Sequence, residues 1–325
     1  MSKLEVIARA VSNIKHALIC GHIMPDGDCL GSVLALALIL KQLGKEATVA
    51  GPDPVPEIYE FLPGIQGYRA GSPPEGDYDT LIALDCPVAE RLGIGYRDLP
   101  GRDLTVINID HHASTNSYGT YRYIDPQAAA VGEIIFDLLQ LMKVNISLDV
   151  AICLYTAIVT DTGSFQYEST TPDTHRRVAR LIEIGVPVSR INVLLYEEKS
   201  RMCQLLLSAA LKTLSFSNCG QVAWMIVTRD MLRDTGAKDE HTEGIVNYAR
   251  SIKGVEVGLL FHELPDGKYK ISFRSKKTVD VNRLAAYFGG GGHLRAAGCE
   301  ISGNINIIEK EVVAAAVCAA GGAGL

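Results

Sequence analysis

The chain has 325 residues, of which 47% are hydrophobic and 21% are charged, and its formal net charge is −6. This acidic balance argues against binding along a long DNA duplex, which requires a broad basic face. The longest apolar run, residues 33–40, is too short for a membrane span of roughly 20 residues. The N-terminal stretch is interrupted by Lys3, Glu5 and Arg9 and lacks the apolar core of a signal peptide. We therefore expect a cytoplasmic protein of two domains, with neither long duplex DNA nor a membrane among its partners.

Short apolar runs alternate with a helical pattern in the first part of the chain. Residues 30–43 are almost continuously apolar and end at Gly44, which predicts a helix. Buried strands are predicted, from runs rich in Val, Ile, Leu and Ala, over residues 17–20, 47–50, 80–84 and 104–109. This alternation indicates a parallel sheet with helices on its faces.

The chain then becomes mainly helical and later returns to strand patterns. Helices are predicted over residues 131–142, 149–159, 172–184, 189–196 and 201–211, the last of them as a connector. Further strands are predicted over residues 213–216, 222–227, 255–262 and 268–273, and helices over 242–252, 281–288 and 306–319. We therefore predict an α/β protein with a parallel-sheet N-terminal domain (1–195), a helical connector (196–212) and a smaller α/β C-terminal domain (213–325).

Acids and histidines directly follow three of the predicted strands. In chain order they are His22, Asp26, Asp28, Asp85, Asp110, His111 and His112. Because the carboxyl ends of parallel strands meet at one edge of a sheet, we expect these side chains to converge. A further acid, Asp161, follows the predicted helix at 149–159.

Acids placed so close to apolar runs are costly to bury unless they are paired or bind a metal. A single acid after a strand is usually a helix cap or turn residue, and a single His-His pair usually lies on the surface. Four such motifs in succession instead favour a metal cluster. Carboxylate and imidazole ligands without a thiolate favour Mn²⁺ or Mg²⁺, and Mn²⁺ is the better partner for imidazole. The eight cysteines form no C-x-x-C pair and are interpreted as buried thiols.

In order and spacing, these residues are similar to those of the DHH phosphoesterase family. That family includes RecJ nucleases, nanoRNases of the NrnA type, cyclic-dinucleotide phosphodiesterases and inorganic pyrophosphatases. The resemblance implies two divalent metal ions that share Asp85 as a ligand. One ion would bind His22, Asp26 and Asp85, and the other would bind Asp28, Asp85, His111 and Asp161. It also implies catalytic roles for Asp110, which would orient a histidine, and for His112, which would contact the substrate phosphate or leaving oxygen.

A glycine-rich motif in the second domain is the predicted substrate site. Glycines without side chains allow backbone N–H groups to line an anion site, whereas a flexible surface loop is the simpler alternative. The predicted substrate-binding residues are Arg274, Ser275, Gly290, Gly291, Gly292, His293 and Arg295. The segment resembles the DHH-associated domain of RecJ-like and NrnA-like enzymes. This implies that it holds the nucleotide end of a substrate over the metals, with the active site in the cleft between the domains.

Chain length and composition restrict the range of substrates that we expect. RecJ has additional nucleic-acid-binding modules, and only 6% of these residues are aromatic, too few for a basic aromatic stripe along a single strand. We therefore predict an Mn²⁺-dependent hydrolase that converts short RNA to 5′-mononucleotides by metal-activated water attack. It would also remove the 3′-phosphate of 3′-phosphoadenosine 5′-phosphate. The alternatives are a phosphodiesterase for cyclic or linear dinucleotides and, less favoured because no ligand is missing, an inactive nucleotide-binding protein. The sequence leaves a homodimer open.

Overall fold

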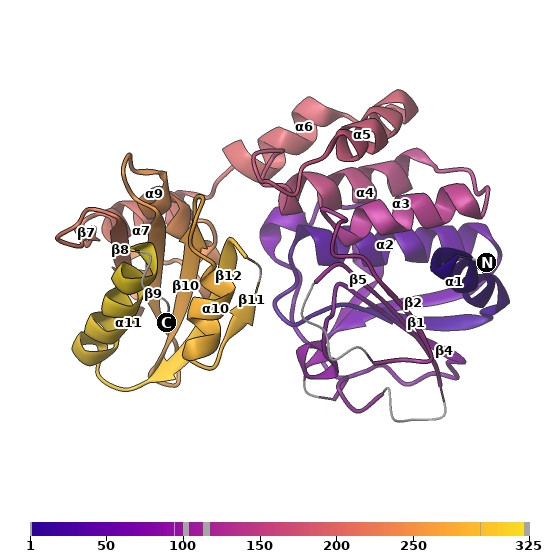
Figure 1. Ribbon diagram of the computed structural model, residues 1–325. Helices are drawn as coiled ribbons and strands as arrows, with labels where there is room; N and C mark the ends of the chain where they lie inside the picture. The colour runs from indigo at the N-terminus through magenta and orange to yellow at the C-terminus, as the bar shows by residue number, and fades with distance from the viewer. Residues whose placement is uncertain (1, 94, 100–103, 113–117, 293, 322–325) are drawn as a thin grey trace. The chain divides into compact units, whose positions relative to one another are not determined.

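The computed structural model describes residues 2–93, 95–99, 104–112, 118–292 and 294–321. The chain forms two compact units, Met1–Glu198 and Lys199–Leu325, and each contains its own six-stranded sheet (Figure 1). The strands of the first unit are β1 (His16–Cys20), β2 (Glu46–Gly51), β3 (Tyr68–Ala70), β4 (Thr80–Leu84), β5 (Thr105–Asp110) and β6 (Tyr121–Ile124). Its α-helices are α1 (Lys3–Asn13), α2 (Gly27–Gln42), α3 (Val131–Leu141), α4 (Leu148–Asp161), α5 (Pro172–Ile184) and α6 (Val188–Asn192).

The strands of the first sheet all run parallel, in the order β3–β2–β1–β4–β5–β6. This confirms the predicted parallel sheet. The chain builds outward from β1 on one side and from β4 on the other. The boundary between β1 and β4 is therefore the topological switch point, where open parallel sheets bind ligands beyond the carboxyl ends of their strands.

Helix α2 is buried on almost every side because it lies between the sheet and α4. Glycine makes this close approach possible. A Cβ atom on Gly31 would lie 2.5 Å from the Cys153 carbonyl oxygen, and one on Gly27 would lie 2.4 Å from the Thr160 hydroxyl. The start of α2 is thus held against the end of α4, and these two ends carry predicted metal ligands.

The second unit has a mixed sheet covered by helices on both faces, which confirms a smaller α/β domain. The strand order is β11–β12–β10–β9–β8–β7, and only β8 and β9 run parallel to each other. The strands are β7 (Ser215–Phe216), β8 (Val222–Val227), β9 (Val257–Glu263), β10 (Lys268–Ser275), β11 (Gly291–Gly292) and β12 (Ala296–Ser302). One core contains residues of α10 (Val281–Tyr287) and α11 (Ile305–Ala320). The other contains residues of α7 (Arg201–Leu211), α8 (Arg229–Thr235) and α9 (Val246–Ser251).

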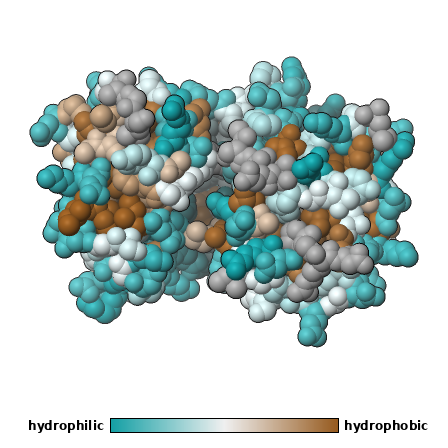
Figure 2. All heavy atoms as spheres, turned by 60° about the horizontal axis from the view of Figure 1, so that its bottom comes forward, coloured by the Kyte–Doolittle hydropathy of each residue, from teal (hydrophilic) through white to brown (hydrophobic). Residues whose placement is uncertain are grey.

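Apolar residues form separate areas among hydrophilic ones over the face shown in Figure 2.

The strongly apolar helices α2 and α4 owe their composition to burial inside the first unit. Within the described ranges, no helix combines the length and the apolar character that a membrane crossing requires.

Close packing of β11 on β12 explains part of the glycine run. A Cβ atom on Gly290 would lie 2.1 Å from the Gly298 carbonyl oxygen and 2.7 Å from the Cys299 Cα atom. Among the described residues, a Cβ atom on Gly291 would meet the Asn282 side chain alone, at an ordinary 3.6 Å. Neighbouring glycines in the same motif are therefore under different steric constraints.

We predict that Gly290→Ala destabilises the second unit and that Gly291→Ala does not. Forcing a methyl group into closely packed backbone costs about 1–3 kcal/mol or more. Trp224, the single tryptophan of the chain, lies in β8 of this unit, so urea unfolding followed by its fluorescence reports the effect directly. Equal free energies of unfolding for the two variants would contradict the packing seen here.

Candidate metal centre

The predicted metal ligands come together at the carboxyl edge of the first sheet. Asp85 and His111 directly follow β4 and β5, and His22 follows β1 after Gly21. The remaining acids lie at the start of α2 and the end of α4. Among the described residues of this unit, ligand atoms lie within 4.8 Å of one another in three overlapping groups. These groups are His22–Asp26–Asp85, Asp28–His111–Asp161 and Asp85–His111–His112.

Asp85 faces a different histidine with each of its carboxylate oxygens. His22 Nε2 lies 3.3 Å from Asp85 Oδ2, and His111 Nε2 lies 3.6 Å from Asp85 Oδ1. Asp26 Oδ2 lies 3.6 Å from His22 Nε2, while Asp26 Oδ1 accepts the Cys29 N–H and caps α2. The nitrogen–oxygen distances exceed those of hydrogen bonds, about 2.7–3.2 Å, and suit atoms that share an ion as ligands.

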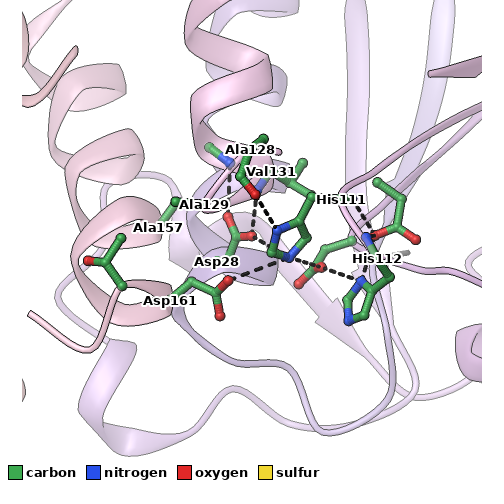
Figure 3. A network of polar contacts seen from close by, with 12 residues as sticks. Asp28, His111, His112, Ala128, Ala129, Val131, Ala157 and Asp161 are labelled. Carbon is green, nitrogen blue, oxygen red and sulfur yellow. Dashed lines mark hydrogen bonds and ion pairs between the residues drawn. The ribbon is translucent and has the colours of Figure 1, made fainter. Parts of the chain in front are cut away.

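His111 also faces the two acids contributed by the neighbouring helices. Its Nε2 atom lies 3.8 Å from Asp28 Oδ2 and 3.5 Å from Asp161 Oδ2 (Figure 3). Since α2 begins where α4 ends, the close helix packing places these two carboxylates near the same imidazole nitrogen. Asp28, Asp161 and His111 therefore form a second ligand group beside Asp85.

Backbone carbonyl groups select the histidine tautomer that a metal requires. His22 Nδ1 lies 2.7 Å from the Ile23 carbonyl oxygen, and His111 Nδ1 lies 3.0 Å from that of Ala128. Because a carbonyl oxygen only accepts hydrogen bonds, each Nδ1 atom carries the proton. The Nε2 atom of each ring is then the one that would bind a metal ion, once it has lost any proton of its own.

Asp28 is held by donors that the sequence alone did not suggest. Its Oδ2 atom accepts the Val131 N–H at 2.6 Å, and its Oδ1 atom accepts the Gly132 N–H at 2.9 Å and the Ser32 hydroxyl at 3.0 Å. The N-cap residue of α3 is Ala130, which has no side chain able to cap, so Asp28 satisfies these amides from another helix. Ser32 could have been found from sequence, because it lies one helical turn after Asp28.

Asp85 adopts a backbone conformation that few residues tolerate. Its φ is +53°, in the left-handed region that Asp enters more readily than most residues. The Asp85 N–H donates to Ile109, and the Asn108 side chain donates to the Cys86 carbonyl oxygen at 3.0 Å. These contacts fix the turn after β4. Asn108 was missed, although a polar residue inside the apolar run at 104–109 was an available signal.

Burial and mutual repulsion control protonation in this cluster. Burial, reinforced by Asp26 and Asp85, raises the pKa of Asp161 to about 7 despite the nearby His111. Burial opposes the charge on His111, yet Asp161, Asp85 and Asp28 raise its pKa to about 10. Asp85 Oδ1 is buried and has no hydrogen-bond partner among the residues that the structure describes. Protons thus balance the negative charge where cations would otherwise do so, and this donor set fits divalent metal ions.

Asp110 orients His112 rather than His111. Asp110 is fully buried, and its Oδ1 atom lies 2.7 Å from His112 Nδ1. The same oxygen accepts the backbone N–H groups of His111 and His112. Since a carboxylate accepts the proton of Nδ1, this contact fixes the orientation of the His112 ring.

The predicted substrate residues lie near one another in the second unit. Arg274 and Ser275 end β10, and Arg295 immediately precedes β12. The Ser275 hydroxyl and the Arg295 Nη1 atom both donate to the Val279 carbonyl oxygen, at 2.6 Å and 2.9 Å. Both side chains therefore hold the turn after β10. His293 lies outside the described residues.

The glycine run offers an anion fewer amides than expected. The N–H groups of Gly289, Gly290 and Gly292 already donate within the unit, to Ala286, Ala285 and the Asn282 side chain. We expected glycine at these positions to leave a row of backbone amides free to bind an anion. The amides at these three positions are not free, because they already donate within the unit. A role of the run in substrate binding stays a prediction.

Buried histidines and aspartates at the switch point of a parallel sheet are typical of a metal-dependent hydrolase. Residues 16–158 match the family model described as "DHH family, N-terminal domain", and residues 220–319 match the DHHA1 domain. The bifunctional oligoribonuclease and PAP phosphatase NrnA of Thermus thermophilus is 32% identical over 304 residues, covering 93% of this chain and 89% of that protein. The NrnA of Bacillus subtilis is 28% identical and covers 92% and 93%. The chain belongs to the DHH family of phosphoesterases.

Solved structures show the same architecture. An exopolyphosphatase-related protein from Bacteroides fragilis superimposes with a TM-score of 0.87 at 26% identity, covering 98% of this chain and 95% of that one. RecJ of Thermus thermophilus, in complex with Mn²⁺, matches 97% of this chain and 54% of its own, with a TM-score of 0.56 at 12% identity. The second likeness concerns the fold alone.

We predict that Asp85→Asn weakens divalent-cation binding in both ligand groups, because it removes the carboxylate that they share. Asp79→Asn is a matched control. Asp79 precedes the same strand at its opposite end, where it accepts the backbone N–H groups of Lys15 and His16. Titration calorimetry with Mn²⁺ should show parental binding for Asp79→Asn and at least a tenfold loss for Asp85→Asn. Parental affinity in Asp85→Asn would contradict the shared role.

Proposed function

We propose that the protein hydrolyses short oligoribonucleotides to 5′-mononucleotides and removes the 3′-phosphate of 3′-phosphoadenosine 5′-phosphate, using two Mn²⁺ ions that Mg²⁺ can replace. The main support for this proposal is the position of Asp85, because its two carboxylate oxygens face His22 and His111. The similarity to NrnA proteins over more than nine tenths of the chain supports the choice of substrates.

Two sets of residues would hold the metal ions. One set is His22, Asp26 and Asp85, and the other is Asp28, Asp85, His111 and Asp161. Such ions supply Lewis acidity toward phosphate oxygens and ease the ionisation of water near neutral pH. The carbonyl groups of Ile23 and Ala128 accept the Nδ1 protons of the two imidazoles, which would leave Nε2 of each ring as the atom that binds an ion.

His112 is the side chain to which we assign proton transfer. Hydrolysis joins a water oxygen to phosphorus and breaks the bond to the leaving oxygen, which then needs a proton. Asp110 accepts the Nδ1 proton of His112 and thereby fixes the orientation of the ring. The Nε2 atom is then the donor to the leaving oxygen. No side chain of the protein needs to bond covalently to phosphorus.

A closely related substrate class is a second candidate. Cyclic dinucleotides and their linear dinucleotide products contain the same phosphodiester between two nucleosides, and the same centre would act on them. Rates on linear diadenylate, cyclic diadenylate and RNA dinucleotides, measured side by side, separate these candidates. A loss of catalysis is disfavoured because every expected His and Asp ligand is present.

We predict that the purified protein with Mn²⁺ releases mononucleotides from labelled RNAs of two to five nucleotides and phosphate from 3′-phosphoadenosine 5′-phosphate. Chelation of the metal should abolish both activities, and the Asp85→Asn variant is the matched inactive protein. Release of phosphate from polyphosphate alone, or no release of mononucleotides, would refute the proposed substrates.

We predict that His112→Gln lowers kcat by about 10²–10⁴-fold, the usual contribution of a proton donor, and leaves Mn²⁺ affinity within about threefold of the parent. Comparing kinetics with calorimetry on one preparation makes the distinction. If affinity instead fell as far as expected for Asp85→Asn, His112 would be a metal ligand, consistent with its place in the Asp85–His111–His112 group.

A further inference from the structure

The turn that leads into α3 contacts two of the proposed metal ligands through backbone atoms. The Ala128 carbonyl oxygen accepts the proton of His111 Nδ1 at 3.0 Å (Figure 3). The Val131 and Gly132 N–H groups donate to Asp28. A shift of this turn would therefore move His111 and Asp28 together.

Glu133 holds this turn in place. Its side chain is buried, with only 2% of its surface exposed, and its Oε2 atom accepts the Ala129 N–H at 3.0 Å. Ala129 lies directly between the carbonyl that orients His111 and the amides that bind Asp28. Glu133 thus fixes the middle of the segment without contacting either ligand.

Arg177 on α5 fixes Glu133 in turn. Its Nη1 atom lies 3.6 Å from Glu133 Oε2. The same guanidinium group binds both carboxylate oxygens of Asp137, at 2.9 Å and 2.6 Å. A two-point contact of this kind restricts the orientation of the guanidinium group. The guanidinium charge that faces Glu133 is therefore held in position by Asp137, which also belongs to helix α3.

We propose that Glu133 is a positioning residue of the metal centre, acting through the Ala129 N–H on the backbone that orients His111 and Asp28. A contact that only capped a helix would contribute to stability and would leave metal binding unchanged. Contacts that orient metal ligands instead typically change metal affinity by about 10–100-fold. The inference rests on the proposed metal centre and is independent of the substrate.

We expect the fold to tolerate conservative replacement of Glu133, because its side chain lines a polar cavity. A cavity of about 280 Å³ is lined by Glu133, Arg177, Tyr123, Gln127 and Ala128, among others. Because water can enter such a polar cavity, a shortened side chain leaves no unfilled apolar core. Variants at this position are therefore suited to binding measurements on the full-length protein.

Two substitutions of Glu133 distinguish the effect of side-chain length from the effect of side-chain charge. Glu133→Asp keeps the charge, but its side chain is one methylene shorter and cannot reach the Ala129 N–H from the same backbone position. Glu133→Gln loses the charge but keeps an oxygen that accepts this N–H. We expect Glu133→Asp to weaken Mn²⁺ binding about 10–100-fold and Glu133→Gln to stay within about threefold of the parent, as measured by titration calorimetry.

Glu256→Asp, in the second unit, is the matched control. Like Glu133, Glu256 accepts backbone N–H groups, namely those of Lys277, Thr278 and Val279. It should bind Mn²⁺ like the parent. Parental affinity in Glu133→Asp, or an equal loss in Glu133→Gln or Glu256→Asp, would overturn the positioning role. Absence of Mn²⁺ binding by the parent would instead refute the proposed metal centre.

Discussion

Repulsion among carboxylates gathered at one edge of a parallel sheet is the constraint on which the rest of the first unit depends. Asp28, Asp85 and Asp110 are each no more than 3% exposed, and unpaired charges so deeply buried are costly. Hydrogen-bond donors account for only part of the compensation, because within the described part of the chain no donor reaches Asp85 Oδ1. Divalent cations would supply the remaining positive charge.

The fold produces this concentration of charge through features that also build its core. The reversal of strand order between β1 and β4 brings His22 and Asp85 together, and glycines let α2 approach α4, so that Asp28 meets Asp161. Two of the acids also serve as helix caps: Asp26 caps α2, and Asp28 satisfies the first amides of α3. Folding and ligand orientation therefore use the same hydrogen bonds.

The sequence predicted the parts of the structure that follow from local pattern. Strands β1, β4 and β5 are apolar runs ending in acids or histidines, so their position in a sheet and the convergence of their side chains were foreseeable. Strand β12 was missed because its start, Ala296–Gly298, has low strand propensity and is formed by backbone pairing with β10.

Features that depend on contacts between residues far apart in the chain could not be predicted from the sequence pattern. The helix predicted from residue 242 begins at Val246 because Gly244 adopts a left-handed φ of +80°. The packing of Gly290 against β12 and the contact of Asn108 with Cys86 likewise arise only when separate strands meet. Tertiary contacts, rather than local propensity, determine these details of the site.

Asp85 would bridge two cations in this centre. Anomalous diffraction at the manganese absorption edge, from crystals of the protein grown with Mn²⁺, locates such ions. We expect two anomalous peaks, one beside His22 and one beside His111, each next to a carboxylate oxygen of Asp85. A single peak, or peaks that do not contact Asp85, would show that Asp85 does not bridge two ions.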